Sequence, residues 1–392
     1  MDERLLEAIR YFTDGTRIMD GLTVVCGDRD RLRCAWKGEH TGEHAVCDLA
    51  SVTKLFTGLS AMRLKEEGLL DPDRPVTFYD DRFSRLEDVT VGQIMSFTVN
   101  LQTPGRIDAC RDRDEALRCL FGAAPAGPTG RRAYSDIPAM ALGCVLERIA
   151  GMKLADCVSE LVLRPAGMTE TWAKVPEDRL RDCMLYGPEY RIEKGRRIVR
   201  RDIRAGVPHD PKAALLQGAD GTLCGHAGLF STAADLTRFC RAVLDERIVS
   251  GESLREIAVN RTGRRLEDGT YTQYLGYMCY LKHPDQYFSE IPAYMGHRAF
   301  GIGGFTGNHL SVDPEKGIFA IFLGNRVRNR LTVLLPEDGK DYTDYGLRAD
   351  GVGMYRWEDG TALPSSVNYV HQKDGHLHRV VAEVMGWPEE NT

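Results

Sequence analysis

The sequence predicts an α+β fold in which helices flank one antiparallel sheet, and both ends of the chain contribute strands to that sheet. Short apolar segments suited to strands occur early, at 22–26 and 32–36, and similar segments return after residue 212. Between them, from about 70 to 211, the chain consists of helical pieces and loops. We therefore expect an α/β sandwich domain formed by residues 1–72 and 212–392, with an inserted, mainly helical domain at residues 73–211.

The N-terminal part predicts a helix, a hairpin and a second helix in that order. A helix is expected at 3–12, and the two apolar segments flank a turn at 27–30, which is the pattern of a β-hairpin. The next helix begins near Ser51, because apolar residues then recur at steps of three and four, and Gly68 supplies a stop. Its apolar positions are Val52, Leu55, Phe56, Leu59 and Met62.

Later segments supply the remaining predicted elements. Helices are expected at 139–149, 233–244 and 377–385, and strands at 270–281, 299–303, 309–312 and 318–323. The last two strands flank a turn sequence, Asp313-Pro314-Glu315-Lys316-Gly317. The basic run 196–204 is interpreted as a solvated strand and turn and not as a nucleic-acid site.

Composition excludes several classes of partner. The chain has 392 residues, 43% hydrophobic content and a net charge of -6, which gives no general attraction to nucleic acid or to an anionic membrane. The N-terminus lacks the apolar core of a secretion signal, and no run approaches the ~18 apolar residues of a membrane span. We expect a cytoplasmic protein with no membrane span, no cofactor and an undetermined oligomeric state.

Cysteine and histidine do not form a recognisable metal motif. The eleven cysteines include no Cys-x-x-Cys pair, which favours small buried thiols in a reducing compartment. Cys224 is the one cysteine for which a catalytic role competes with a structural one. His209 and His226 fall in probable site loops but lack a second histidine at ligand spacing, so packed or capping roles are favoured and no metal site is expected.

Ser51 and Lys54 form the most informative pair in the chain. They lie three residues apart at the start of an apolar helix, and residues at this spacing share a helix face. A serine hydroxyl needs an adjacent base to act as a nucleophile near neutral pH, and an amine can supply one. Backbone N–H groups at a helix N-terminus can also stabilise developing negative charge. Ser-x-x-Lys alone is also compatible with a solvated helix face.

A second motif, Tyr134-Ser135-Asp136, directly precedes the helix expected at 139–149. From this junction the Tyr134 hydroxyl could face Ser51 and Lys54 and shuttle protons. The alternative is a half-buried tyrosine followed by Asp136 as a helix cap.

The third motif is a glycine-rich strand end, Phe300-Gly301-Ile302-Gly303-Gly304-Phe305-Thr306-Gly307. Glycines allow a substrate to approach the backbone closely, and a main-chain N–H at this level could serve as a second oxyanion donor. A bulge or tight turn explains the glycines equally well. No Gly-Lys-Ser/Thr signature follows, so the run is not a phosphate-binding loop.

With these three motifs in this order, the chain resembles the serine β-lactamase and penicillin-binding-protein superfamily. The resemblance spans nearly the whole chain and is strongest to the class C-like branch, which includes family VIII esterases, D-alanyl-D-alanine carboxypeptidases and D-aminopeptidases. The segments 225–232 and 305–326 also resemble the corresponding parts of that branch. The implied fold is the β-lactamase/transpeptidase-like one.

The resemblance also implies roles for individual residues. Ser51 would be the acylated nucleophile, Lys54 the base that activates it, and Tyr134 the partner that relays protons. The main-chain N–H groups of Ser51 and Phe305 would hold the oxyanion. Asp136 stands where asparagine often binds substrate, and as an acid it could instead pair with Lys54.

The chain departs from the superfamily at Ile302-Gly303-Gly304. Many lactamases and peptidases carry Lys-Thr-Gly or His-Thr-Gly here, and the cation binds the substrate carboxylate. Isoleucine cannot supply that charge, so the motif is closer to the Trp-Gly-Gly form of family VIII esterases. With Asp136 and Phe305, these three positions are the expected substrate-binding residues. A second departure, the extra segment 329–368, is interpreted as a lid, an oligomer contact or a surface excursion.

The sequence therefore predicts a serine hydrolase that forms a Ser51 acyl-enzyme with a small ester or amide, with ester hydrolysis favoured. A D-amino-acid amidase or peptidase, or a weak β-lactamase, is the alternative among enzymes. A catalytically silent binding protein on the same scaffold is the alternative from another class.

Overall fold

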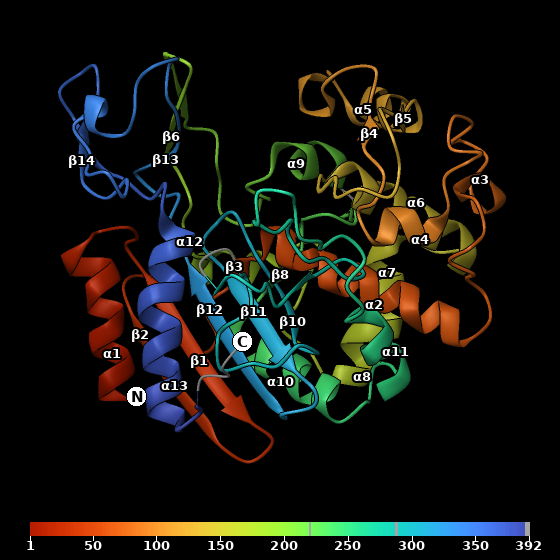
Figure 1. Ribbon diagram of the computed structural model, residues 1–392, viewed down its shortest axis with the longest axis horizontal. Helices are drawn as coiled ribbons and strands as arrows, with labels where there is room; N and C mark the ends of the chain where they lie inside the picture. Colours follow the sequence, from red (N-terminus) through yellow and green to blue (C-terminus); the bar gives the residue numbers. More distant parts are fainter. Residues whose placement is uncertain (219–220, 287–288, 389–392) are drawn as a thin grey trace.

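The computed structural model describes residues 1–218, 221–286 and 289–388, and a six-stranded sheet lies at its centre (Figure 1). The strand order is β2-β1-β12-β11-β10-β9, and every neighbouring pair is antiparallel. Both ends of the chain contribute, as predicted. The strands are β1 Leu22–Asp28, β2 Leu32–Lys37, β9 Tyr280–Leu281, β10 Phe300–Gly303, β11 His309–Asp313 and β12 Ile318–Gly324.

The join between the two chain ends lies between β1 and β12. Their register runs from Leu22 opposite Gly324 to Asp28 opposite Ile318. Every residue of β12 is buried, which is expected for a strand rich in isoleucine, phenylalanine and leucine that is covered on both faces.

Helices cover both faces of the sheet. On one face, α1 Glu3–Arg10 and α13 Arg379–Met385 lie side by side, and their apolar residues form a core with β1 and β12 (Figure 1). On the other face, α10 Ala233–Leu244 packs on the sheet, and α2 Thr53–Glu66 and α6 Ile137–Ala150 extend the larger core. The helices expected near 3–12, 51–67, 139–149, 233–244 and 377–385 are thus confirmed.

Shorter elements complete the described part of the chain. The further helices are α3 Val76–Tyr79, α4 Val91–Met95, α5 Arg113–Phe121, α7 Leu154–Val158, α8 Arg164–Ala166, α9 Pro211–Gln217, α11 Gly251–Ile257 and α12 Tyr369–Gln372. The further strands are β3 Cys47–Asp48, β4 Leu101–Gln102, β5 Ala124–Pro125, β6 Glu189–Glu193, β7 Arg196–Arg200, β8 Phe230–Ser231, β13 Arg330–Leu335, β14 Met354–Arg356 and β15 Ala362–Pro364. None of the described helices is long and apolar enough to cross a bilayer.

The strand predicted at 270–281 is largely wrong, because only Tyr280 and Leu281 form a strand there. Met278 adopts a positive φ of 56°, a conformation that interrupts an extended strand. The Met278 N–H also donates to the Met95 carbonyl oxygen, away from the sheet. The buried run 275–279 therefore fills the core from a loop.

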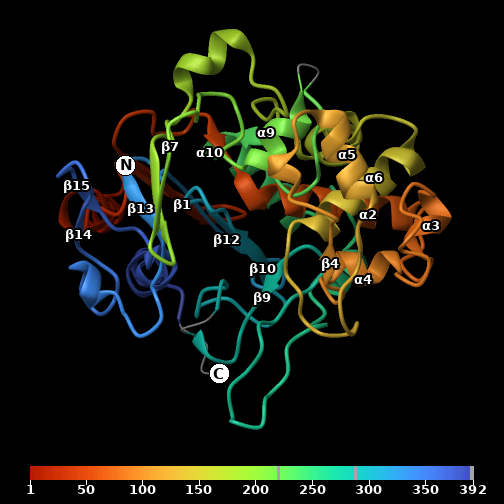
Figure 2. The ribbon, with the colours of Figure 1, turned by 90° about the horizontal axis from the view of Figure 1, so that it is seen from above.

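The segment 329–368 folds into a small unit with β6 and β7. β13 pairs in parallel with β6, and β14 pairs with β15. Side chains including Tyr190, Leu331 and Trp357 form a separate apolar cluster there. Figure 2 shows this unit on the opposite side of the molecule from α3–α6. Strands β6 and β7 fall inside the predicted helical insert, and β6 pairs with the C-terminal strand β13. The predicted domain boundaries at residues 73 and 211 stay a prediction.

Candidate active site

Ser51 lies on a tight turn that joins β3 to α2. Ala50–Val52 form one turn of 3-10 helix, so Ser51 precedes the α-helix on which it was expected. The Asp48 carboxylate accepts the Ala50 N–H at 2.9 Å, and Ala50 has a positive φ of 46°. A non-glycine residue in this conformation is strained and is held by its surroundings. The turn thus fixes the direction of the Ser51 side chain.

Lys54 is fully buried, and its amine contacts three oxygen atoms. The distances from Nζ are 2.9 Å to Ser51 Oγ, 2.9 Å to Asp136 Oδ1 and 3.2 Å to the carbonyl oxygen of His226. The predicted approach of Ser51 and Lys54 and the predicted pairing of Asp136 with Lys54 are both present.

Asp136 determines the charge of Lys54 in the resting protein. Burial by itself would lower the pKa of Lys54, but the Asp136 carboxylate outweighs burial and raises that pKa above its ordinary value. Burial likewise opposes ionisation of Asp136, yet Lys54 holds the pKa of Asp136 well below its usual range. Lys54 is therefore an ammonium at rest, and it must lose a proton before it can act as a base.

Lys212, Asp210 and His226 form a charged network that contacts the other oxygen of Asp136. Lys212 Nζ lies 3.2 Å from Asp136 Oδ2 and 3.1 Å from Asp210 Oδ2. Asp210 Oδ1 lies 3.0 Å from His226 Nε2, and His226 Nδ1 lies 3.4 Å from the Cys224 sulfur. Burial alone would lower the pKa of His226, but Cys224 and the Asp210 carboxylate raise it to about 10.

The sequence predicts His226 in a site loop but gives no sign that Asp210 and Lys212 connect it to Asp136. Asp210 also caps a helix, since its side chain accepts the N–H groups of Lys212 and Ala213. The donor atoms of Asp136, Asp210 and His226 lie within 4.8 Å of one another, a spacing that a metal ion could use. Lys54 and Lys212 already occupy the carboxylate oxygens there, so the donor set suits ammonium groups better than a metal ion.

Tyr134 lies beside Lys54, with its ring centroid 5.4 Å from Nζ. The ring packs against Phe97 at 4.8 Å and Tyr280 at 5.3 Å between centroids. No hydrogen bond joins the Tyr134 hydroxyl to Ser51 or Lys54. The Tyr134 ring therefore lies near Lys54, as predicted, and a proton relay requires its hydroxyl to come within hydrogen-bond distance of Ser51.

The glycine-rich strand end lies directly against the Ser51 turn. A Cβ on Gly304 would lie 2.8 Å from the Leu49 carbonyl oxygen and 3.4 Å from the Ala50 Cβ, so only glycine fits without displacement. The Asp48 carbonyl oxygen accepts hydrogen bonds from Thr306 Oγ1 at 3.1 Å and Asn308 Nδ2 at 2.6 Å. The close approach predicted for the glycines is explained by this contact with the chain's own backbone.

Ile302 and Gly303 occupy different surroundings from Gly304. The Ile302 side chain is fully buried in the apolar core, and its predicted role in substrate binding stays a prediction. A Cβ on Gly303 would lie 3.1 Å from Glu290 Oε2. A substrate at this strand end would therefore meet backbone atoms, and Phe305 is the first side chain that is partly exposed there.

Phe305 is held by three polar side chains. The His209 ring stacks on it at 5.7 Å between centroids, and the guanidinium carbons of Arg191 and Arg326 lie 5.2 and 4.6 Å from its centroid. Arg326 Nε also donates to the Phe305 carbonyl oxygen at 2.8 Å. The N–H of His209 donates to Asp48 Oδ2 at 2.6 Å, which connects this group to the Ser51 turn.

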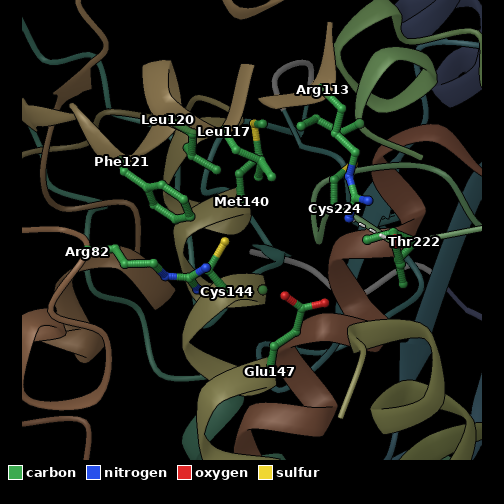
Figure 3. Close-up of a pocket in the computed structure, with 13 residues that line it drawn as sticks. Arg82, Arg113, Leu117, Leu120, Phe121, Met140, Cys144, Glu147, Thr222 and Cys224 are labelled. Carbon is green, nitrogen blue, oxygen red and sulfur yellow. Dashed lines mark hydrogen bonds between the residues drawn. The ribbon is translucent and has the colours of Figure 1, made fainter. Parts of the chain in front are cut away.

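A pocket of about 130 Å³ lies along α6 (Figure 3). Its wall is largely apolar, with Leu120, Phe121 and Met140, and carries Arg82 and Glu147. Ser51, Lys54 and Tyr134 do not line it. Cys224 does line it and thereby links the pocket to the His226 network.

Comparison with known proteins agrees with this geometry. The family model described as Beta-lactamase matches residues 8–337. This chain belongs to the β-lactamase family. Among curated relatives of this β-lactamase-family protein, one from Escherichia coli O157:H7 is named as a candidate D-alanyl-D-alanine carboxypeptidase. The two sequences are 24% identical over an alignment 318 residues long, which covers 71% of this chain and 68% of the relative.

Two solved structures show that the fold is shared. EstCE1, described as a hydrolase with promiscuous acyltransferase activity, superposes with a TM-score of 0.65 at 20% identity over 82% of this chain and 93% of its own. A class C β-lactamase superposes with a TM-score of 0.62 at 16% identity over 82% of this chain and 90% of its own. The resemblance and the fold class predicted from the sequence are confirmed.

Proposed function

We propose that this β-lactamase-family protein is a serine hydrolase that forms an acyl-enzyme on Ser51 and cleaves a small ester or amide, with esters favoured. One observation carries the proposal: the 2.9 Å hydrogen bond between Ser51 Oγ and the fully buried Lys54 amine. A buried amine against a hydroxyl on a strained turn is the arrangement that activates a serine nucleophile.

Acylation begins when Lys54 gives its extra proton to solvent. Neutral Lys54 then takes the proton of Ser51 Oγ as that oxygen bonds to the acyl carbon, and the carbonyl oxygen becomes the oxyanion. When the oxyanion collapses, the bond between the acyl carbon and the leaving group breaks, Tyr134 gives the leaving group a proton, and Lys54 returns a proton to Tyr134. Water later cleaves the acyl-enzyme by the reverse proton transfers. Asp136 fixes the position of Lys54 and also restricts its deprotonation.

The main-chain N–H groups of Ser51 and Phe305 are the proposed oxyanion donors. Gly304, the residue before Phe305, is in contact with the Ser51 turn. Preorganised N–H groups of this kind contribute about 3–4 kcal/mol of transition-state stabilisation in serine hydrolases.

The site favours esters over substrates that need a cation on β10. The buried Ile302 side chain offers no charge at the position where lactamases and carboxypeptidases carry one. The name of the E. coli relative supports a D-alanyl-D-alanine carboxypeptidase as the second candidate. p-Nitrophenyl butyrate, a D-alanyl p-nitroanilide and nitrocefin, assayed on one preparation, distinguish ester, amide and lactam hydrolysis.

The direct test is intact-mass detection of a fluorophosphonate adduct. We expect one adduct on the wild-type protein, none on Ser51→Ala, and slower labelling of Lys54→Met. Ser60→Ala is the matched control. Ser60 lies on α2, and its hydroxyl donates a hydrogen bond to the Phe56 carbonyl oxygen, so its removal should leave labelling unchanged. Labelling that persists in Ser51→Ala contradicts the assignment, and a folded wild-type protein with neither adduct nor turnover favours the silent binding protein.

A further inference from the structure

Cys224 is a nucleophilic side chain that the proposed mechanism does not use. Its sulfur lies 3.4 Å from His226 Nδ1, and His226 Nε2 lies 3.0 Å from Asp210 Oδ1. An activated nucleophile needs a base within hydrogen-bond reach and a third group that orients this base. Cys224, His226 and Asp210 supply these three parts.

The histidine is placed to stabilise negative charge on the sulfur. Burial alone would lower the pKa of His226, but Cys224 and the Asp210 carboxylate raise it, so the buried imidazole is protonated. Thiols react through the thiolate, and an imidazolium next to a thiol favours that form. The sulfur also lies 3.3 Å from the Ala227 carbonyl oxygen, a second contact that fixes its position.

Two other cysteines have different surroundings. Cys34 is also partly exposed, but its sulfur lies 3.9 Å from a carboxylate oxygen of Glu43, and burial and this carboxylate raise the pKa of Cys34. Cys144 lines the same pocket as Cys224, and burial raises the pKa of Cys144. A thiol with a raised pKa is a weaker nucleophile near neutral pH, because less of it is thiolate. We therefore expect Cys224 to react first of these three.

A group attached to Cys224 has room in the pocket along α6, which Cys224 lines (Figure 3). The backbone that follows is closely packed. A Cβ on Gly225 would lie 2.4 Å from the Ala139 carbonyl oxygen, and Thr57 Oγ1 donates to the Gly225 carbonyl oxygen at 2.7 Å. The main chain next to Cys224 is therefore held between α2 and α6, and an attached group extends into the pocket.

The pocket suits a small uncharged group. Its volume is about 130 Å³, and an apolar cavity of about 150 Å³ holds one benzene molecule. The charged side chains of the wall have protein partners, since Arg82 binds Asp80, Arg113 binds Thr222 and Glu147 accepts a backbone N–H. A ligand therefore meets mainly apolar side chains, and a group of a few heavy atoms fits.

The segment that carries Cys224 also fixes Lys54. The carbonyl oxygen of His226 accepts a hydrogen bond from Lys54 Nζ at 3.2 Å. A sulfur that is bonded to a second sulfur carries no negative charge, so it holds the His226 imidazolium less strongly. Modification of Cys224 therefore loosens the residue whose backbone helps to position the proposed base.

We propose that Cys224 is a modification site that exchanges with small uncharged disulfides, and that the mixed disulfide slows turnover at Ser51 until it is reduced. In the exchange, the Cys224 sulfur bonds to one sulfur of the disulfide while the S–S bond breaks, and the electron pair leaves with the second sulfur. The proton held between Cys224 and His226 passes to that leaving sulfur, so one thiol is oxidised and another is released. The effect on turnover rests on the proposed function, whereas formation of the mixed disulfide does not.

Hydroxyethyl disulfide is the probe for the site, with intact mass and peptide mapping as the measurement. We expect an adduct at residue 224 that a phosphine reductant removes and that Cys224→Ser lacks. It should form at least about tenfold faster than adducts at Cys34 and Cys144 in the same sample. His226→Gln should slow the reaction at Cys224 about 100-fold, the usual contribution of a positioned base, without slowing the reaction at Cys34.

The comparison within one sample separates a lost base from a lost fold, because unfolding would speed the reactions at Cys34 and Cys144. Equal rates at the three cysteines of the wild type, or an unchanged rate at Cys224 in His226→Gln, would overturn the inference. Glutathione disulfide, which is larger and charged, should react much more slowly at Cys224. Equal rates for the two disulfides would refute the role of the pocket.

Turnover of p-nitrophenyl butyrate by the same preparations tests the effect on Ser51. Complete modification should lower kcat/KM about 10- to 100-fold, the usual effect of losing a hydrogen bond to a charged group, and reduction should restore it. Cys34→Ser is the matched control and should keep this response, whereas Cys224→Ser should not respond to the reagent. Unchanged kcat/KM in the fully modified protein would refute the switch. Absence of turnover in the reduced protein would refute the hydrolase assignment and the effect on turnover, and the mass measurement would still decide the modification site.

Discussion

Replacing Asp136 with asparagine tests whether this carboxylate keeps Lys54 protonated. The substitution preserves the size of the side chain and an oxygen for the amine while it removes the negative charge 2.9 Å from Lys54 Nζ. Two unit charges about 4 Å apart attract each other by about 4 kcal/mol at an effective dielectric constant of about 20. The Asp136 side chain is 28% exposed, so solvent screening reduces this attraction, and we expect the substitution to remove about 3 kcal/mol of it.

That energy sets the expected change in protonation. About 3 kcal/mol corresponds to a roughly hundredfold higher ratio of neutral to charged Lys54 at a given pH. Because the neutral amine is the proposed base, the rising limb of kcat/KM against pH should move to lower pH in Asp136→Asn. The assay is p-nitrophenyl butyrate hydrolysis from about pH 5 to pH 10, with folding checked by circular dichroism at each end of the range.

Lys212→Met provides the opposite perturbation. Lys212 Nζ lies 3.2 Å from the other Asp136 oxygen. Loss of the Lys212 charge leaves Asp136 more strongly attracted to Lys54, so the rising limb of kcat/KM against pH should move to higher pH. If the rising limb of kcat/KM stays at the same pH in both variants, or moves to higher pH in Asp136→Asn, then deprotonation of Lys54 does not control the nucleophile.

Three further changes have defined outcomes. Gly304→Ala places a methyl group 2.8 Å from the Leu49 carbonyl oxygen and should lower kcat about tenfold or more with little change in the far-ultraviolet dichroism; unchanged kcat would mean that the strand end does not position the Ser51 turn. Cys224 and Asp210 raise the folded-state pKa of His226 from 6.5 to about 10, so the stability that protonated His226 contributes is complete below about pH 6.5 and is lost as the pH rises toward 10. Across this window, Tm should fall more in the wild type than in His226→Gln. An equal decrease of Tm with pH in the two proteins would contradict a buried imidazolium. Trp357→Ala removes a large side chain from the cluster of β6 and β13–β15 and should cost about 3–5 kcal/mol in urea unfolding of that unit; a cost under about 1 kcal/mol would show that the cluster is loosely packed.

Local patterns predicted the central sheet and the covering helices well. The apolar spacing of Val52 to Met62 and the continuous apolar run of 318–323 are properties of neighbouring residues, and they specify a helix and a buried strand directly. The spacing of Ser51 and Lys54 likewise fixed their contact, because three residues of chain leave little freedom between the two side chains.

Long-range contacts account for what the sequence did not show. Asp210 and Asp136 are joined through Lys212, and Glu189 is joined to Arg191 and Thr332, by contacts that depend on how distant segments cross. The segment 270–279 resembles a strand in sequence because its buried apolar and aromatic residues are those that strands also prefer.

Asp48 connects the Ser51 turn to the residues around Phe305 through three sets of hydrogen bonds. One of its carboxylate oxygens holds the backbone before Ser51, the other holds His209, and its carbonyl oxygen holds the turn after Phe305. Replacement of the 189–209 segment would therefore also move the turn that carries Ser51, unless the hydrogen bond from the residue 209 N–H to Asp48 were kept. The two parts of the site can be exchanged only together.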